Sequence, residues 1–458
     1  MELPPIPPFK TKTVEPVYFS SRKERSQRVQ KANYNLFNLH SDWVTIDLIT
    51  DSGTGAMSEQ QWAEIMIGDE SYAGSESFFK LQRTVEEIMG FKFLAPTHQG
   101  RAAENILFSA TVKEGHIVPG NAHFDTTKGH IEFRKAIALD CTIQEAFQTE
   151  ADHPFKGNID LEKLEQAVIQ YGAERVPFII ITVTCNTVGG QPVSLQNIRE
   201  TKSLAAKYGI AVYMDIARYA ENAYFIKLRE KEFDDWSILE IVGEMFNGVD
   251  VVWMSAKKDG LVNIGGFIAL NDQGLFERLC QFTIIYEGYV TYGGMSGRAM
   301  GALAVGLREA CEFNYLKDRI MQVQYLGEKL KDLDIPIQSP VGGHAIYIDA
   351  LKFFPQVPQS EYPAQLLAVE LYIEAGVRGV EIGTLLADRD PETGKDRLPE
   401  MELLRLAIPR RVYSLQHMDY IAVALANIKQ RASDYTSGFR IIKQAPILRH
   451  FTVELERN

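Results

Sequence analysis

Two adjacent lysines follow an apolar run that is typical of a buried strand. The segment MSAKKDG spans residues 254–260 and comes directly after VDVVW. A lysine that is partly desolvated beside another cation has a lowered pKa, so its amine becomes a nucleophile able to form a Schiff base. Ser255 adds a hydroxyl group for a phosphate. We therefore predict that Lys257 or Lys258 reaches a ligand, with two solvated lysines in a loop as the alternative.

A second polar cluster lies where a predicted helix begins. In PTHQGRAAEN, His98, Gln99, Gly100 and Arg101 follow a short strand and precede the helix. The free N–H groups and the positive dipole end of a helix attract anions, and Arg101 adds a guanidinium. This arrangement suits a phosphate group. The alternative is a capped loop with a surface arginine.

Two further clusters follow apolar strands. Asn186 comes after PFIIITVT, where its amide can donate to a ligand oxygen, although asparagine is also common in turns. Asp215 ends the strand IAVYMD, and Arg218 follows three residues later. A carboxylate beside a heteroaromatic nitrogen keeps that nitrogen protonated. An internal ion pair between Asp215 and Arg218 explains this segment equally well.

All four clusters lie at strand ends, where open α/β sheets bind their ligands. They supply a phosphate site, a partner for a ring nitrogen, donors for a ring oxygen and an amine, which pyridoxal 5′-phosphate (PLP) requires. Asp215 precedes Lys258 by 43 residues, the length of one βαβ unit, so both can meet at neighbouring strand ends. One alternative is a dinucleotide-binding domain, although YGGMSGRAMG lacks the GxGxxG spacing. Another is a regulator that keeps a PLP site without catalysis.

The elements that must position these side chains alternate along the chain. From about residue 76, helical segments such as SLQNIRETKSLAAKYG alternate with apolar strands such as PFIIITVT and VDVVWMS. This order predicts an α/β fold with a mostly parallel sheet and helices on both faces. After about residue 320 the pattern indicates a smaller α/β domain. We expect residues 1–55 to form an N-terminal arm and part of the small domain, 56–320 the large domain, and 321–458 the small domain.

The composition is that of an ordinary soluble globular protein. Of 458 residues, 45% are apolar and 24% are charged, and the formal net charge is −12. This charge argues against a nucleic-acid partner, which requires a basic face. Four dispersed cysteines favour neither a disulfide framework nor a zinc site. No apolar stretch reaches the roughly 18 residues of a membrane span, and MELPPIPPFKTKTVEP lacks the apolar core of a signal peptide. We expect a cytoplasmic protein without a membrane partner.

With these clusters placed, the chain resembles the aromatic amino-acid β-eliminating lyases. The resemblance runs from PFKTKTVEPV to ILRHFTVE, and its motifs include IDLITDSGTGAMS, GDESYAGSESFF, PTHQGR, MSAKKD and RLAIPRRVY. It implies the aspartate-aminotransferase-like fold of PLP enzymes (fold type I), with a seven-stranded type of sheet in the large domain. It also implies PLP and a monovalent cation, K⁺, as cofactors, an amino-acid substrate and a homotetramer.

The resemblance also implies roles for individual residues. Lys258 resembles the Schiff-base lysine, Phe124 the ring that stacks on the cofactor, and Asp215 the partner of the pyridine nitrogen. Asn186 and Arg218 resemble the donors near the phenolic oxygen of the cofactor. The remaining assignments form three groups. The phosphate site comprises Gln99, Gly100, Arg101, Ser255 and Lys257. The clamp on the substrate carboxylate comprises Arg405, Thr50, Ser52 and Asn186. The potassium site comprises Gly53, Glu70 and Asn263.

Three positions distinguish the two branches of this family. Asp125, Ile382 and His450 stand where the tyrosine-cleaving members carry threonine, arginine and phenylalanine. A cation near the oxygen stabilises a phenol leaving group. An indole leaving group is instead favoured by an apolar wall and by an acid near its carbon. The resemblance therefore predicts PLP-dependent β-elimination of L-tryptophan to indole, pyruvate and ammonium. Tyrosine and S-substituted cysteine remain alternative substrates.

The predicted mechanism gives each catalytic side chain one task. Lys258 removes the α-proton of the substrate as a general base, while Arg405 holds the substrate carboxylate. Tyr72 resembles the family's tyrosine that is contributed near a neighbouring subunit's cofactor, and it is the first candidate for the acid that protonates the leaving carbon. Asp125 and His450 support that step or position the indole nitrogen.

Overall fold

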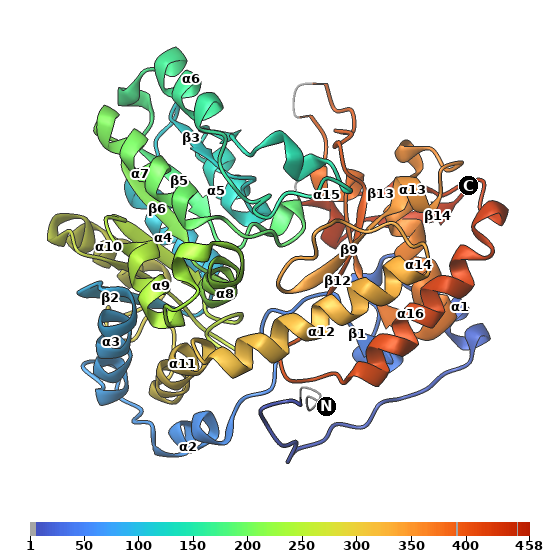
Figure 1. Ribbon diagram of the computed structural model, residues 1–458, viewed down its shortest axis with the longest axis horizontal. Helices are drawn as coiled ribbons and strands as arrows, with labels where there is room; N and C mark the ends of the chain where they lie inside the picture. The colour runs from blue at the N-terminus through green and yellow to red at the C-terminus, as the bar shows by residue number, and fades with distance from the viewer. Residues whose placement is uncertain (1–5, 391–392, 447) are drawn as a thin grey trace. The chain divides into compact units, whose positions relative to one another are not determined.

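The computed structural model describes residues 6–390, 393–446 and 448–458 (Figure 1). The first five residues of the predicted N-terminal arm lie outside the described part. The chain divides into two units. Unit 1 comprises Ser52–Ala146 and His153–Ile320, together with the described residues of Met1–Pro8. Unit 2 comprises Phe9–Asp51, Phe147–Asp152 and Met321–Asn458.

Unit 1 is built on a seven-stranded sheet. Its strands are, in spatial order, β2 (Phe93–Thr97), β8 (Gly266–Leu270), β7 (Val251–Ser255), β6 (Ala211–Asp215), β5 (Phe178–Thr182), β3 (Ile117–Gly120) and β4 (Ile137–Asp140). β8 runs antiparallel to β2 and β7, and the remaining neighbours are parallel. The predicted α/β fold with a mostly parallel sheet is confirmed.

The apolar strands of unit 1 bury side chains on both faces of the sheet. In β5, Ile179 and Ile181 join one core cluster, while Phe178 and Ile180 join another. This alternation follows from the two-residue period of a strand and explains why the run reads as continuously apolar. Helices cover both faces. The cluster with Ile179 includes residues of α3 (Glu76–Met89), α7 (Leu195–Tyr208), α8 (Tyr219–Arg229), α9 (Ile238–Phe246) and α11 (Gly297–Ala310), and the cluster with Phe178 includes residues of α4 (Gly100–Thr111), α5 (Asp125–Phe133) and α10 (Gln273–Tyr286).

Helix α7 begins and ends where its sequence predicts. The Ser194 side chain accepts a hydrogen bond from the Asn197 amide, which caps the first turn. Gly209 ends the helix in the left-handed conformation, with a φ of 65° that favours glycine. The further helices of unit 1 are α2 (Glu59–Ile67) and α6 (Leu161–Tyr171), and α12 (Phe313–Asp332) begins in unit 1 and ends in unit 2.

Unit 2 contains a three-stranded antiparallel sheet with the order β11 (Val380–Ile382), β12 (Leu403–Ala407) and β9 (Ala345–Asp349). Two strand pairs accompany it: β1 (Ile46–Asp47) with β10 (Val377–Arg378), and β13 (Phe439–Lys443) with β14 (Glu454–Arg457). Its helices are α1 (Arg22–Lys31), α13 (Ala350–Phe353), α14 (Pro363–Ala375), α15 (Thr384–Ala387) and α16 (Leu415–Lys429). Within the ranges given above, none of the helices has the length and apolar character that crossing a membrane requires.

Candidate active site

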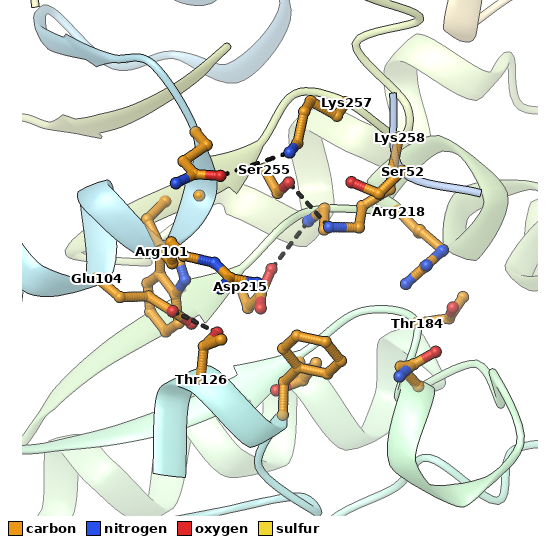
Figure 2. Close-up of a pocket in the computed structure, with 17 residues that line it drawn as sticks. Ser52, Arg101, Glu104, Thr126, Thr184, Asp215, Arg218, Ser255, Lys257 and Lys258 are labelled. Atoms are coloured by element: carbon orange, nitrogen blue, oxygen red, sulfur yellow. Dashed lines mark hydrogen bonds between the residues drawn. The ribbon is translucent and has the colours of Figure 1, made fainter. Parts of the chain in front are cut away.

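A cavity in unit 1 gathers side chains from the carboxyl ends of β5, β6 and β7 and from the start of α4 (Figure 2). Its empty volume, open mouth included, is about 610 Å³, within the usual size of a small-molecule site. The predicted residues that line it are Ser52, Gln99, Gly100, Arg101, Phe124, Asn186, Asp215, Arg218, Ser255, Lys257 and Lys258. Residues that lie 206 positions apart in the sequence thus face one space.

The two lysines have different partners in this cavity. Strand β7 ends at Ser255, and the Lys258 Nζ donates a hydrogen bond to the Ser255 Oγ at 2.8 Å (Figure 2). The Lys257 Nζ lies 3.5 Å from the Gln99 Oε1. Burial lowers the pKa of Lys257, and the Arg101 cation lowers it further. Both lysines are half-buried and line the cavity, so neither is the fully solvated loop lysine of the alternative interpretation.

Asp215 is a buried carboxyl group on the strand next to β7. It is the last residue of β6 and pairs in register with Trp253 of the parallel neighbour β7. Its Oδ1 accepts a hydrogen bond from the Ala217 amide at 3.0 Å. Burial raises the pKa of Asp215, and the amide and the cations Lys258 and Arg218 oppose that rise. Since a buried carboxylate needs a cationic partner, this position suits a protonated ring nitrogen.

The start of α4 forms an anion cradle against the end of β7. Gln99 occupies the N-cap position without a side-chain cap hydrogen bond, so its own side chain does not compete with a ligand for the first turn of the helix. A Cβ atom at Gly100 would lie 2.5 Å from the Ser255 Cβ. Only glycine permits this approach, which brings the helix dipole, the Ser255 hydroxyl and Arg101 to one place. These donors fit the phosphate group of PLP.

Glu104 lines the same cavity, although no sequence pattern predicted it. It is 2% exposed and accepts a hydrogen bond from the Thr126 Oγ1 at 2.6 Å (Figure 2). It accepts another from the Thr127 Oγ1. Burial, and secondly the charge of Asp215, raise the pKa of Glu104 to about 7. A glutamate inside a helix is usually solvated. The sequence offers one indication that Glu104 faces the cavity: it follows Gly100 by four residues, so the two residues lie on the same face of the helix.

Other residues missed by the sequence reasoning complete the wall of the cavity. They are Thr126, Thr182, Thr184, Ala217 and Trp253. Threonine, alanine and tryptophan carry no sequence signal of their own at these positions, because the same types also occur in ordinary cores and turns.

Two predicted catalytic residues of unit 1 do not line the cavity. Tyr72 is 62% exposed, and its hydroxyl oxygen accepts a hydrogen bond from the Tyr289 amide at 3.2 Å. Its ring centroid lies 5.1 Å from that of Tyr292. Asp125 is the first residue of α5, directly after Phe124, and its Oδ1 accepts a hydrogen bond from the Thr126 amide at 2.7 Å.

The residues predicted for the potassium site fall into two groups. The Asn263 Nδ2 donates to the Gly53 carbonyl oxygen at 2.9 Å, so these two residues are in contact. Gly53 has a φ of 76°, a conformation that favours glycine. Glu70 instead forms a half-exposed ion pair with Arg298, with an N–O distance of 2.8 Å.

Unit 2 holds the remaining predicted residues, which are Thr50, Arg405, Ile382 and His450. Arg405 lies in β12, and its Nη2 donates to the Ile49 carbonyl oxygen at 3.1 Å. Ile382 ends β11 and pairs in register with Leu403. His450 is buried in a short 3₁₀ turn, Arg449–Phe451, where its ring centroid lies 3.9 Å from that of Phe451.

Comparison with known sequences gives a consistent set of matches. The sequence model of a family described as "Beta-eliminating lyase" matches residues 47–424. A "Probable beta-eliminating lyase" of Trichomonas vaginalis is 57% identical, covering 100% of both chains. A tyrosine phenol-lyase of Pasteurella multocida is 47% identical over 99% of this chain and 98% of its own. A tryptophanase of Salinibacter ruber is 50% identical over 98% and 95%, respectively.

Solved structures match the fold at low sequence identity. A serine palmitoyltransferase from Sphingomonas wittichii superposes with a TM-score of 0.62 and 14% identity, covering 90% of this chain and 97% of its own. A serine palmitoyltransferase from S. paucimobilis with bound PLP–myriocin aldimine gives a TM-score of 0.59 and 12% identity, covering 85% and 88%. At these identities the likeness concerns the arrangement of elements alone.

Proposed function

The chain belongs to the beta-eliminating lyase family, and from this premise we propose that it cleaves L-tryptophan into indole, pyruvate and ammonium with PLP as cofactor. Its fold is that of the PLP-dependent enzymes of fold type I. One observation carries the proposal: the Lys258 amine and the buried Asp215 carboxyl group line one cavity at the ends of neighbouring strands.

The cavity offers a partner for each polar part of PLP. Lys258 would hold the aldehyde carbon, and Asp215 the ring nitrogen. The amides at the start of α4, with Arg101, Ser255 and Lys257, would hold the phosphate. Phe124 would stack on the ring, and Asn186 and Arg218 would donate to the ring oxygen. When bound, PLP supplies an electron sink for negative charge at the substrate α-carbon.

The protein supplies binding and proton transfer. Arg405 binds the substrate carboxylate with Thr50, Ser52 and Asn186, because a guanidinium and a carboxylate form paired charged hydrogen bonds. The Lys258 amine removes the α-proton as general base. Asp215 would stay ionised beside the ring nitrogen of the bound cofactor and would hold the proton on that nitrogen.

Substrate choice depends on the residues that meet the leaving group. The identities of 47% to the tyrosine phenol-lyase and 50% to the tryptophanase are too close to separate the two. Three side chains favour indole over phenol: Asp125, Ile382 and His450. Ile382 offers an apolar wall at a position where a cation would stabilise a phenol leaving group. Asp125 and His450 can position the indole nitrogen. Tyr72 is the first candidate for the acid that protonates the leaving carbon.

The cation and the assembly form part of the same proposal. K⁺ would bind near the Gly53 carbonyl, Asn263 and Glu70. The exposure of Tyr72 supports a role at a neighbouring subunit's site within a homotetramer. Potassium dependence of the rate and the mass of the protein in solution test these two points. A cytoplasmic location belongs to this proposal and is tested by fractionation of cells.

A pyruvate-release assay tests the reaction. Purified protein would be given tryptophan, tyrosine and S-methylcysteine, each with and without potassium. We expect kcat/KM to be higher for tryptophan than for tyrosine. A preference for tyrosine would reassign the substrate. Bound cofactor without turnover of any substrate would favour the regulator alternative, and a bound nicotinamide dinucleotide would favour the dinucleotide-binding alternative.

A further inference from the structure

Two buried glutamates in unit 2 hold the start of the short helix α15, directly after Ile382. The Glu381 Oε1 accepts a hydrogen bond from the Leu385 amide at 2.9 Å, and its Oε2 accepts one from the Leu386 amide at 3.1 Å. The Glu402 Oε2 accepts from the Thr384 amide at 2.8 Å and from the Thr384 Oγ1 at 2.7 Å. Glu381 is 3% exposed and Glu402 is fully buried. Every amide of this first turn therefore binds a carboxyl group.

The chain is shaped to admit the second carboxyl group. Ile382, the last residue of β11, pairs in register with Leu403, the first residue of β12, so Gly383 and Glu402 lie side by side just beyond the paired ends. A Cβ atom at Gly383 would lie 2.4 Å from a Glu402 carboxylate oxygen. Because any larger residue would displace Glu402, glycine at this position permits the contact.

Arg449 holds the same turn from its carbonyl side. Its Nη2 donates to the Thr384 carbonyl oxygen at 2.8 Å, and its Nε donates to the Leu385 carbonyl oxygen at 3.3 Å. Its Nη1 pairs with the Asp396 Oδ1 at 2.6 Å. The Arg449 side chain is fully buried, and the next residue along the chain is His450. The turn after Ile382 and the backbone before His450 are thus joined through one guanidinium.

The charges around the two glutamates come from several elements. Arg449 is the cation, and Asp396 and Asp388 are its further acidic partners. Tyr362 donates to the Asp396 Oδ2 at 2.7 Å, and His450 lies in a small cavity that Glu381 also lines. Burial raises the pKa of Glu381 well above its usual range, and the Glu402 charge raises it further. Burial also raises the pKa of Glu402. The two carboxyl groups therefore resist ionising together.

We propose that Glu381, Glu402 and Arg449 are positioning residues that fix the α15 turn and thereby hold Ile382 and His450 in place for the leaving group. This inference rests on the proposed function, which assigns Ile382 and His450 to the leaving-group side of the substrate. The three residues act through Ile382 and His450. Their removal should therefore change the relative kcat/KM of substrates that differ in the leaving group.

The first test compares two substrates in the cofactor-loaded enzyme. The double variant Glu381→Gln with Glu402→Gln removes the negative charge but keeps the shape of both side chains. We expect kcat/KM to fall at least about tenfold more for tryptophan than for S-methylcysteine, whose leaving group is small. Glu370→Gln is the matched control, because Glu370 is buried in the same unit but pairs with Tyr435 and Arg457. Its ratio of the two rates should equal that of the wild type.

The second test uses pH and a single variant. Ionisation of both glutamates at alkaline pH places two like charges side by side, which loosens the turn. The wild-type ratio of tryptophan to S-methylcysteine kcat/KM should fall as the pH is raised from neutral into the alkaline range. Glu381→Gln mimics the protonated state, so its ratio should stay constant over this range. A ratio that is flat in the wild type, or that falls equally in the variant, would overturn the proposal.

Hydrogen exchange separates this inference from the proposed function. Amides of residues 384–386 should exchange at least about tenfold faster in the double variant than in Glu370→Gln, because they lose charged acceptors. Unchanged exchange, or equal rate losses on both substrates, would overturn the positioning role. If the wild type cleaved neither substrate, the proposed function would fail, while faster exchange in the double variant would still support the fixing of the turn.

Discussion

Both units bury acidic side chains, but the partners of those side chains differ. In unit 1, Asp215 lies in the wall of a cavity, with one backbone amide and two cationic side chains near it. In unit 2, Glu381 and Glu402 accept hydrogen bonds from backbone amides of α15, so their partners belong to the protein itself. A buried acid beside an open cavity invites a cationic ligand. Buried acids that bind their own backbone fix the position of that backbone.

This contrast separates chemistry from positioning. Removing a cavity-facing group should abolish binding or a chemical step, because the ligand loses a partner that nothing replaces. Removing a group that faces the chain should instead change which substrate is preferred or how stable the fold is. Four further variants sharpen or break this comparison.

Lys258→Ala should have the largest effect. Loss of the amine removes both the covalent hold on the cofactor and the general base, so kcat should fall by at least about 10³-fold. The absorbance band of the lysine-linked cofactor should disappear. Lys257→Ala is the control, since it should keep that band while weakening cofactor affinity. A retained lysine-linked chromophore in Lys258→Ala would assign the role to another residue.

Glu104→Gln tests a residue that lines the cavity but whose carboxyl group accepts hydrogen bonds from side chains of the protein. The folded-state pKa of about 7 lies above the unfolded value of 4.5, so Glu104 destabilises the fold once the unfolded chain ionises. As pH rises from about 4.5 to about 7, the free energy of unfolding of the wild type should fall by about 3 kcal/mol relative to Glu104→Gln. Calorimetry of the cofactor-free proteins at several pH values measures this difference. A pH-independent difference would show that Glu104 ionises normally.

Arg405→Ala tests whether a residue of unit 2 can face a ligand. A charged hydrogen bond contributes about 2 kcal/mol, so KM should rise about 30-fold for every amino-acid substrate. Arg405→Lys should recover part of this loss, because it keeps the charge but not the paired geometry. Steady-state kinetics with tryptophan and S-methylcysteine measure both. An unchanged KM would move the carboxylate site elsewhere.

Asp125→Thr should have the smallest effect, confined to one substrate class. The resemblance implies threonine at this position in the tyrosine-cleaving branch, so the variant should lose about tenfold in kcat/KM for tryptophan and little for S-methylcysteine. Thr126→Ser, at the next position of α5, is the control. Equal losses on both substrates would remove Asp125 from indole recognition.

Local patterns predicted the elements that form the sheet and its helices. Ser194 and Gly209 delimit α7 because capping depends on a few neighbouring residues. The apolar run of β5 identified a strand buried on both faces. No local pattern predicted that Phe147–Asp152 would join unit 2, because that depends on long-range contacts such as the hydrogen bond from Thr149 to Asp349 at 2.8 Å.

The functional residues also divide into those that local sequence patterns predicted and those that they did not. Lys258, Asp215 and the start of α4 were identified from the sequence, because each couples a reactive or charged group to a strand or helix end. No sequence pattern predicted Glu104, Glu381 or Glu402, since a glutamate is usually exposed. The sequence by itself determined the fold class, the family and the residue types available for chemistry. Only the tertiary structure decided which acids are buried and what they contact, because burial depends on packing between segments that are distant along the chain.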